Sequence, residues 1–172
     1  NGTYGVEFVS QPLSYDYWVN HVPEVFWQYF KDNFLARNLG ECGIHVHIGW
    51  DSMTVPERYV FLTVLEQMQE QNSELLEAIA GRSSNTYARW DSLVYRGAKD
   101  RAFEVALEKT QTGANPMYNA INTQHEATVE LRYFQGNTGR NSILSILQFI
   151  QTLYNFAGYI TSNFTWDYGV CL

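Results

Sequence analysis

Two histidines stand one residue apart in the apolar segment CGIHVHIGW, residues 42–50. The segment is short, rich in β-branched residues and bounded by glycines, a pattern that predicts a strand over 43–50. Because side chains alternate between the two faces of a strand, His45 and His47 would lie on the same face. The opposite face would carry the apolar residues, which we assign to the core: Ile44, Val46 and Ile48.

The same alternation places polar groups on one face of two further segments. In EATVELRYF, residues 126–134, Glu130 and Arg132 share a face and oppose the apolar Val129 and Leu131. In GVEF, the carboxylate of Glu7 opposes the flanking apolar residues. If the three strands are neighbours in one sheet, five polar side chains converge: Glu7, His45, His47, Glu130 and Arg132.

Such a set of side chains has a clear chemical use. Carboxylates with one imidazole suit Mg²⁺ or Mn²⁺, which prefer oxygen ligands and retain waters. A second imidazole and a guanidinium suit phosphate oxygens. The face would therefore bind a divalent cation and an anion together, as sites for metal-bound nucleotides do.

The residues alone leave three other interpretations open. The two histidines can be solvated strand residues, and Glu130 with Arg132 can be a surface ion pair. The His-x-His pair also supplies two ligands of a zinc site. Zinc would need a third ligand, for which His21 and His125 are both available and neither is favoured by spacing.

The elements that must position these residues can be outlined from the pattern. We expect strand, helix, strand, helix, strand and helix in one domain, an α+β or α/β layer protein. A capping box at residues 54–57 starts the second helical stretch, and Gly81 ends it. The last helix is apolar around most of its circumference, so we expect it to be buried on more than one side. The expected ranges are a strand at 4–10, helix over 13–36 broken near Pro23, helix from 54 to Gly81, helix near 99–109, a strand at 126–134 and helix at 141–161.

Composition narrows the function classes. The 172 residues are 45% hydrophobic, which is enough for one domain with a real core. The net charge of -7 argues against nucleic acid as the main partner. No uninterrupted apolar run reaches the length of a membrane span and no signal peptide is evident, so we expect a cytoplasmic protein without a membrane partner. Cys42 and Cys171 are expected to be free thiols.

Four segments in order resemble one known family. They are GVEFVSQPL, CGIHVHIG, GRSSNTYA and YNAINTQHEATVELRYFQGN, and the likeness runs over about residues 3–157. They resemble the amidoligases, carboxylate–amine ligases related to glutamate–cysteine ligase and, more distantly, to glutamine synthetase. The pair CGIHVHIG and VELRYFQG is the specific part of the likeness.

The resemblance implies a fold and a reaction. The fold would be α+β, a largely antiparallel sheet with helices packed on one face, as in the glutamine-synthetase-like ligase core. The reaction would be ATP-dependent and Mg²⁺- or Mn²⁺-dependent amide formation through an acyl phosphate. The partners would be a nucleotide and a carboxylate–amine pair, where the substrate is a small amino acid, a peptide or a protein side chain.

The resemblance also implies roles for individual residues. Glu7, His45 and Glu130 would be metal ligands. His47 and Asn122 would bind the nucleotide, and Arg132 would hold phosphate or the substrate carboxylate. Arg82 and Tyr87 match a segment that faces substrate or phosphate in such enzymes.

One departure from the family pattern concerns the start of the chain. The family begins with a strand carrying paired acidic residues, ahead of the segment matched by NGTYGVEF. Residues 1–172 are therefore expected to be a single, N-terminally incomplete ligase-like domain that lacks its first strand. A further chain or segment could supply that strand. The missing strand makes one alternative a non-catalytic ligase-like binding or structural module of a larger assembly. A second alternative, which rests on the His-x-His pair, is a Zn²⁺-dependent hydrolase.

Overall fold

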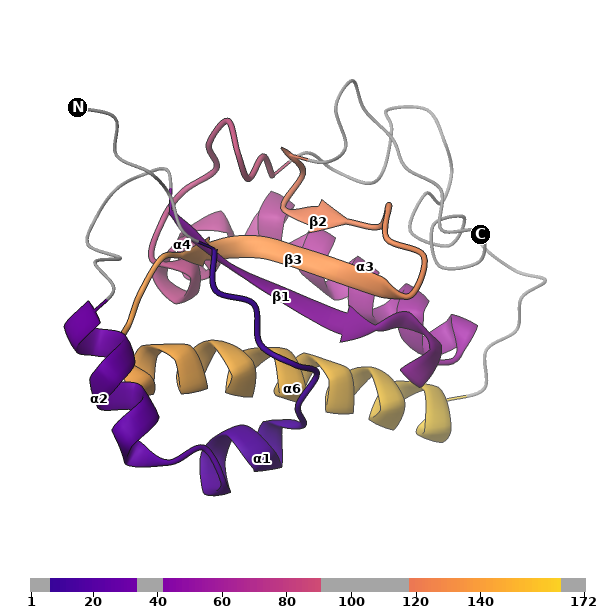
Figure 1. Cartoon of the computed structure of the whole chain (residues 1–172). Coiled ribbons are helices and arrows are strands. Elements are labelled where there is room, and N and C mark those ends of the chain that lie inside the picture. The colour runs from indigo at the N-terminus through magenta and orange to yellow at the C-terminus, as the bar shows by residue number, and fades with distance from the viewer. Residues whose placement is uncertain (1–6, 34–41, 91–117, 165–172) are drawn as a thin grey trace.

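The chain folds around a small antiparallel sheet. The computed structural model describes residues 7–33, 42–90 and 118–164, and Figure 1 shows their arrangement. The strands are β1 (Gly43–Gly49), β2 (Ile121–Asn122) and β3 (Thr128–Gln135), in the order β1-β3-β2 with both neighbouring pairs antiparallel. The expected α+β class with an antiparallel sheet is confirmed. The two-residue β2 is a strand that the sequence pattern does not predict.

Two consecutive helices, α3 (Val55–Gln71) and α4 (Ser73–Ala80), follow β1 and lie on one side of the sheet (Figure 1). The expected capping box is present, since Thr54 and Glu57 bond each other's backbone groups at the start of α3. The expected single helix is wrong at Asn72, which ends α3 and begins α4 with φ -136° and ψ 40°. Gly81 ends α4 in the left-handed region with φ 74°, where glycine is favoured.

The core lies between the sheet and these helices. Val129 and Leu131 of β3 are fully buried and belong to one cluster with residues of α3, α4 and the last helix, α6 (Arg140–Asn163). The expectation that α6 is buried on more than one side is wrong. Its buried residues form one stripe at helical spacing, which consists of Ile146, Ile150, Leu153 and Ala157.

The outer side of α6 is apolar as well as exposed. Phe156 and Tyr159 are exposed, and the helix is long and apolar enough to cross a membrane by length and composition. Its most apolar 18-residue window has a mean hydropathy of 1.2, and 22% of that window is buried. A single such helix is weak evidence for a membrane span, because the core helix of a soluble protein passes the same test.

The N-terminal part forms two short helices before the sheet. These are α1 (Tyr15–Asn20) and α2 (Glu24–Asn33), and Pro23 lies between them, as expected. The strand expected at 4–10 is wrong for residues 7–10, which have no regular secondary structure. The ring of Phe8 instead packs against Phe26 and Phe30 of α2, at 5.7 and 5.3 Å between centroids. The helix expected near 99–109 lies outside the described residues.

The pairing of β1 with β3 contains a register shift. Val46 lies opposite Leu131 but Ile44 lies opposite Phe134, so two residues of β3 oppose the single residue His45. Such a bulge interrupts the alternation of faces. It explains why the neighbours Tyr133 and Phe134 are both fully buried, whereas the sequence predicts strict alternation over 126–134.

Candidate functional site

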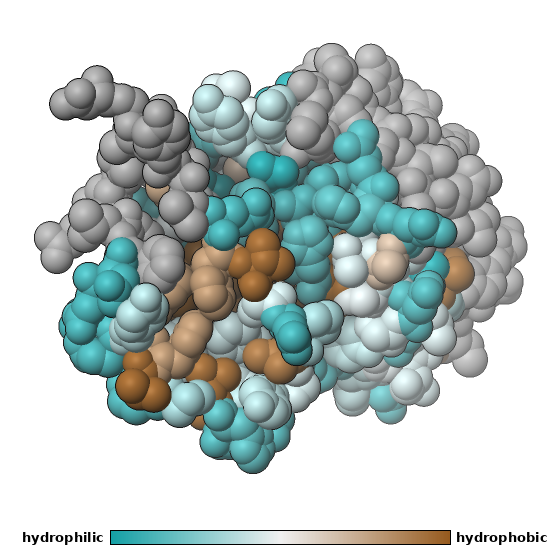
Figure 2. All heavy atoms as spheres, in the orientation of Figure 1, coloured by the Kyte–Doolittle hydropathy of each residue, from teal (hydrophilic) through white to brown (hydrophobic). Residues whose placement is uncertain are grey.

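The polar face of the sheet is centred on Glu130, in the middle strand. Its Cα partners are His47 on β1 and Asn122 on β2. The side chain is only 4% exposed, although it lies on the face opposite Val129 and Leu131. Figure 2 shows hydrophilic residues gathered over the middle of the molecule on the side where Figure 1 shows the sheet. A buried carboxylate in the centre of a polar face needs several compensating partners.

Five side chains supply those partners. One carboxylate oxygen, Oε1, lies 2.9 Å from Nδ1 of His45, 3.6 Å from Nη1 of Arg132 and 3.8 Å from Nε2 of His47. The other oxygen, Oε2, accepts a hydrogen bond from Nδ2 of Asn122 at 2.8 Å and lies 3.0 Å from Nε2 of His125. Four of the residues predicted from sequence thus meet at Glu130, together with one histidine that was assigned no role in the ligase interpretation.

These contacts fix the charge of Glu130. Burial alone would raise the pKa of the carboxyl group. The hydrogen bonds from His45, His125 and Asn122, together with the positive charge of Arg132, outweigh burial and lower the pKa to about 2. The carboxylate is therefore ionised at neutral pH and can act as a metal ligand or orient a neighbouring imidazole.

His47 is held in an orientation that leaves one nitrogen available. Its Nδ1 lies 3.2 Å from the hydroxyl oxygen of Thr128, and its Nε2 points toward Glu130. Burial lowers the pKa of His47, although the charges of Glu130 and Glu7 oppose that shift, while His125 and His45 add to it. The imidazole is thus neutral at pH 7 and carries a lone pair on one nitrogen.

Glu7 lies at the margin of this cluster. It is exposed, and its negative charge acts on His47 across space. Its segment forms no strand, and it passes across the sheet in the view of Figure 1. Glu7 therefore does not belong to a neighbouring strand as expected, and its role as a metal ligand stays a prediction.

His125 is the residue whose position the sequence leaves undecided. It lies in the loop between β2 and β3, and its ring centroid is 5.0 Å from that of His47. From sequence it is only one of two candidate third ligands for zinc. The sequence holds no clear signal for this position, because His125 is brought to the polar face of β3 by the two-residue strand Ile121–Asn122.

Arg82 lies at the edge of the sheet and contacts its backbone. Its guanidinium donates hydrogen bonds to the carbonyl oxygens of Tyr133 at 2.9 Å, of Arg132, and of Cys42 at 3.3 Å. Burial, followed by the charge of Arg132, lowers the pKa of Arg82. The contacts to Arg132 and Tyr133 satisfy carbonyl groups at the bulge. Substrate binding by Arg82 stays a prediction.

Tyr87 is not among the five side chains that contact Glu130. It is 48% exposed, in a turn where Oδ1 of Asn85 accepts its backbone N–H at 2.9 Å. Its ring contacts Tyr118 edge to face, at 6.0 Å between centroids. A catalytic role for Tyr87 also stays a prediction.

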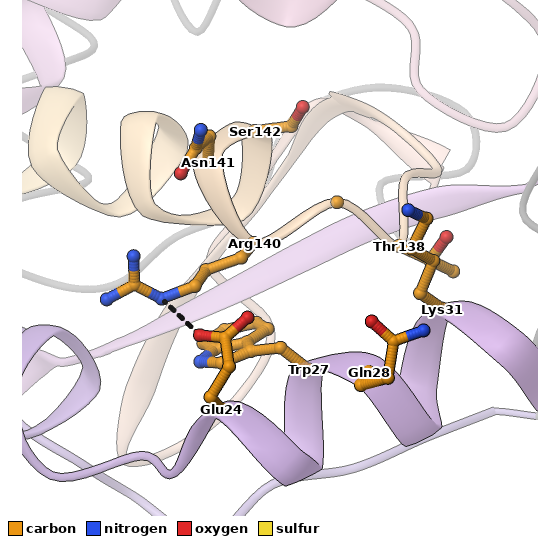
Figure 3. A pocket seen from close by; sticks show the side chains of 9 residues that line it. Glu24, Trp27, Gln28, Lys31, Thr138, Arg140, Asn141 and Ser142 are labelled. Atoms are coloured by element: carbon orange, nitrogen blue, oxygen red, sulfur yellow. Dashed lines mark ion pairs between the residues drawn. The ribbon is translucent and has the colours of Figure 1, made fainter.

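A separate pocket lies between α2 and the start of α6 (Figure 3). Its side chains include Trp27, Lys31 and Thr138, and an ion pair of 3.8 Å joins Nε of Arg140 to Glu24. None of its lining residues belongs to the cluster around Glu130. The concave surface and the group of titratable side chains are therefore different places in the described part of the molecule.

A metal ion could be held by three of the clustered residues. One ligand atom each of His47, His125 and Glu130 lies within 4.8 Å of the other two. The set implied by the resemblance is different, since it consists of Glu7, His45 and Glu130. The carboxylate of Glu130 is common to both sets, so it is the central ligand in either case.

The family assignment follows from comparison with known proteins. Residues 1–154 match the model of a family described as "putative amidoligase enzyme". No curated protein and no solved structure matches the chain significantly. The matched region includes the His-x-His strand and the Glu-x-Arg strand, whose side chains meet at Glu130. The chain belongs to the amidoligase family.

Proposed function

We propose that this chain is the core of an ATP-dependent ligase that joins a substrate carboxylate to an amine. The observation that carries the proposal is the cluster around Glu130, where one ionised carboxylate meets imidazoles, an amide and a guanidinium on one sheet face. Membership of the amidoligase family supports amide formation as the reaction class.

The free thiol of Cys42 is compatible with the reducing cytoplasm, which we propose as the location.

The proposed reaction has two steps. A carboxylate oxygen of the substrate attacks the γ-phosphorus of ATP, forming an acyl phosphate and releasing ADP. The amine then attacks the carbonyl carbon, so that a C–N bond forms, the C–O bond to phosphate breaks, and the amine loses a proton. Both steps need charge neutralisation and positioning more than a protein nucleophile.

The side chains on the polar face suit these needs. Arg132 would lie against phosphate oxygens, because a guanidinium donates hydrogen bonds to anions, and His47 would lie beside them. Asn122 positions Glu130 by its 2.8 Å hydrogen bond, and it would also border the nucleotide. The donor atoms present fit a divalent cation, which Glu130 would hold with a neighbouring imidazole and, when it approaches, Glu7. When bound, the cation neutralises phosphate charge. The acid and the amine would be small amino acids, peptides or protein side chains.

A hydrolase is the second candidate, and one observation favours it. Only His47 of the His-x-His pair belongs to the candidate metal group, and His125 and Glu130 supply the other two zinc ligands. Two histidines and one glutamate with open positions are a ligand set of zinc hydrolases. A hydrolase would cleave an amide without ATP, whereas a ligase would consume ATP to form one.

Calorimetry of ATP binding tests the ligase proposal. We expect the chain to bind ATP in a Mg²⁺-dependent manner, and His47→Ala and Arg132→Ala each to weaken binding at least tenfold. The control is Arg140→Ala, which removes a cation away from the cluster and is expected to leave ATP affinity unchanged. Absence of ATP binding by a protein with a cooperative unfolding transition would overturn the ligase, as would equal affinity in all four proteins.

A turnover assay separates the two candidates. A ligase releases ADP and phosphate in step with amide formation, and only when acid and amine are both present. A hydrolase cleaves amide substrates at a rate that ATP does not change.

A further inference from the structure

We propose that His47, His125 and Glu130 form a site for a zinc-class transition-metal ion, and that Mg²⁺ does not occupy it. The inference concerns the same polar face on which the proposed function rests. Binding of the metal ion would require neither ATP nor turnover, because the three side chains themselves supply the donor atoms.

The distances between the donor atoms suit a small cation. Nε2 of His125 lies 3.0 Å from Oε2 of Glu130, and Nε2 of His47 lies 3.8 Å from Oε1. Zinc binds nitrogen and oxygen ligands at about 2.0–2.2 Å, so the ligand atoms of a tetrahedral site lie roughly 3.4 Å apart. One ligand atom from each of the three side chains lies within 4.8 Å of the other two, so a bound ion would draw these atoms together by up to about 1.4 Å.

Neighbouring groups orient two of the three ligands, His47 and Glu130. The hydroxyl of Thr128 lies 3.2 Å from Nδ1 of His47, and accepting a hydrogen bond there leaves the Nε2 lone pair free for a metal. The carboxylate of Glu130 receives Nδ2 of Asn122 at 2.8 Å and lies 2.9 Å from Nδ1 of His45. Metal-ligating histidines and carboxylates are typically fixed by such hydrogen bonds from a second layer of residues.

The donor set disfavours Mg²⁺. Two of the three donors are imidazole nitrogens, which suit zinc, iron, nickel and copper, whereas Mg²⁺ takes oxygen ligands in octahedral geometry. The site offers one negative charge, and Arg132 lies 3.6 Å from that carboxylate. A hard cation gains little from such a site. The Mg²⁺ that accompanies ATP would be a separate ion, held by phosphates and water.

The site is open on one side. The side chains of His47 and His125 are 45% and 46% exposed, and that of Glu130 is 4% exposed. The metal would therefore lie at the surface of the polar face with positions left for water or for a substrate oxygen. A bound ion there would act on that oxygen as a Lewis acid.

The experiment is a metal-binding titration of the metal-free full chain without nucleotide. Zn²⁺ is titrated in competition with a chromophoric chelator, and Co²⁺ is titrated by its visible absorption. We expect one equivalent of either ion, with Zn²⁺ retained against about a thousandfold excess of Mg²⁺. His125→Gln and His47→Gln should each weaken Zn²⁺ binding at least tenfold.

His21→Gln is the matched control, because His21 lies at the end of α1 beside Asp16 and outside the cluster. Its Zn²⁺ affinity should equal that of the parent. Displacement of Zn²⁺ by equimolar Mg²⁺ would overturn the proposal. So would unchanged affinity in a folded His125→Gln protein, or no binding by the folded parent. Binding of Zn²⁺ without binding of ATP would support the proposed metal site and overturn the proposed ligase. Binding of ATP without binding of Zn²⁺ would support the ligase and overturn the metal site.

Discussion

Glu130 is ionised in the interior because its neighbours compensate for burial. An isolated buried carboxyl group would be protonated near neutral pH or would destabilise the fold. Here both oxygens have partners, from His45 on one side and from Asn122 and His125 on the other. The fold therefore maintains a negative charge at the centre of the sheet, and this charge attracts cations to the polar face.

The depressed pKa of Glu130 predicts an acid-sensitive contribution to stability. A pKa lowered from 4.5 to about 2 stabilises the native state above pH 4.5, and that stabilisation is lost as the pH falls toward 2. Over this pH window we expect the metal-free parent to lose up to about 3 kcal/mol more of its free energy of unfolding than the metal-free Glu130→Gln variant loses. Urea unfolding of both proteins across pH 2–6 measures the difference. Parallel pH profiles would contradict the assignment.

At the scale of elements, the bulge between β1 and β3 places the aromatic and charged residues of β3. The guanidinium of Arg82, which follows α4, donates hydrogen bonds to the carbonyl oxygens of the bulge residues Arg132 and Tyr133 and to that of Cys42, just before β1. Gly43 leaves room for that side chain, since a Cβ there would lie 3.0 Å from Nη2 of Arg82. Arg82 thus connects the helical layer with both long strands.

Replacing Arg82 should therefore destabilise the protein. Arg82→Ala removes the guanidinium donor to the carbonyl oxygens of Arg132 and Tyr133, and we expect a loss of about 3 kcal/mol in the free energy of unfolding. Arg82→Lys should recover part of this loss, because an ammonium can donate to some of the same oxygens. Arg140→Ala, which breaks a partly exposed ion pair, should cost less than about 1 kcal/mol. Chemical denaturation of the three variants tests the order, and equal losses for Arg82→Ala and Arg140→Ala would refute the role of the bulge.

Local signals predicted some elements better than others. The capping box at Thr54, the break at Pro23 and the apolar alternation of β1 depend on neighbouring residues, and all three are observed. The segment at 7–10 has β-forming residues, but the contact of Phe8 with α2 decides its conformation. The position of His125 depends on a two-residue strand too short to give a pattern. The pairing of β1 with β3 creates the site, but the sequence does not show which strands are neighbours, so this pairing could only be assumed.

At the scale of the whole molecule, α6 forms a layer that is buried along one stripe. Ile150 is 5% exposed within this stripe, whereas Phe156 is 44% exposed on the outer side. Ile150→Ala should lower the free energy of unfolding by roughly 2–4 kcal/mol, as expected for truncation in a core. Phe156→Ala should change it by less than about 1 kcal/mol. If α6 were buried on more than one side, both variants would lose several kcal/mol in the same denaturation experiment.

Occupation of the polar face should stabilise the whole chain, because the native state alone brings the three metal ligands together. A ligand at one hundred times its dissociation constant adds about 2.7 kcal/mol, and each kcal/mol raises the melting temperature of a chain of this length by about 2–4 °C. We therefore expect Zn²⁺ to raise the melting temperature of the metal-free protein by roughly 5–10 °C. Mg²⁺ at the same concentration should leave it unchanged, and His125→Gln should abolish the response to Zn²⁺ while His21→Gln retains it. Calorimetric melting curves measure all four cases. Equal shifts with Zn²⁺ in the two histidine variants would mean that the ion binds elsewhere on the chain.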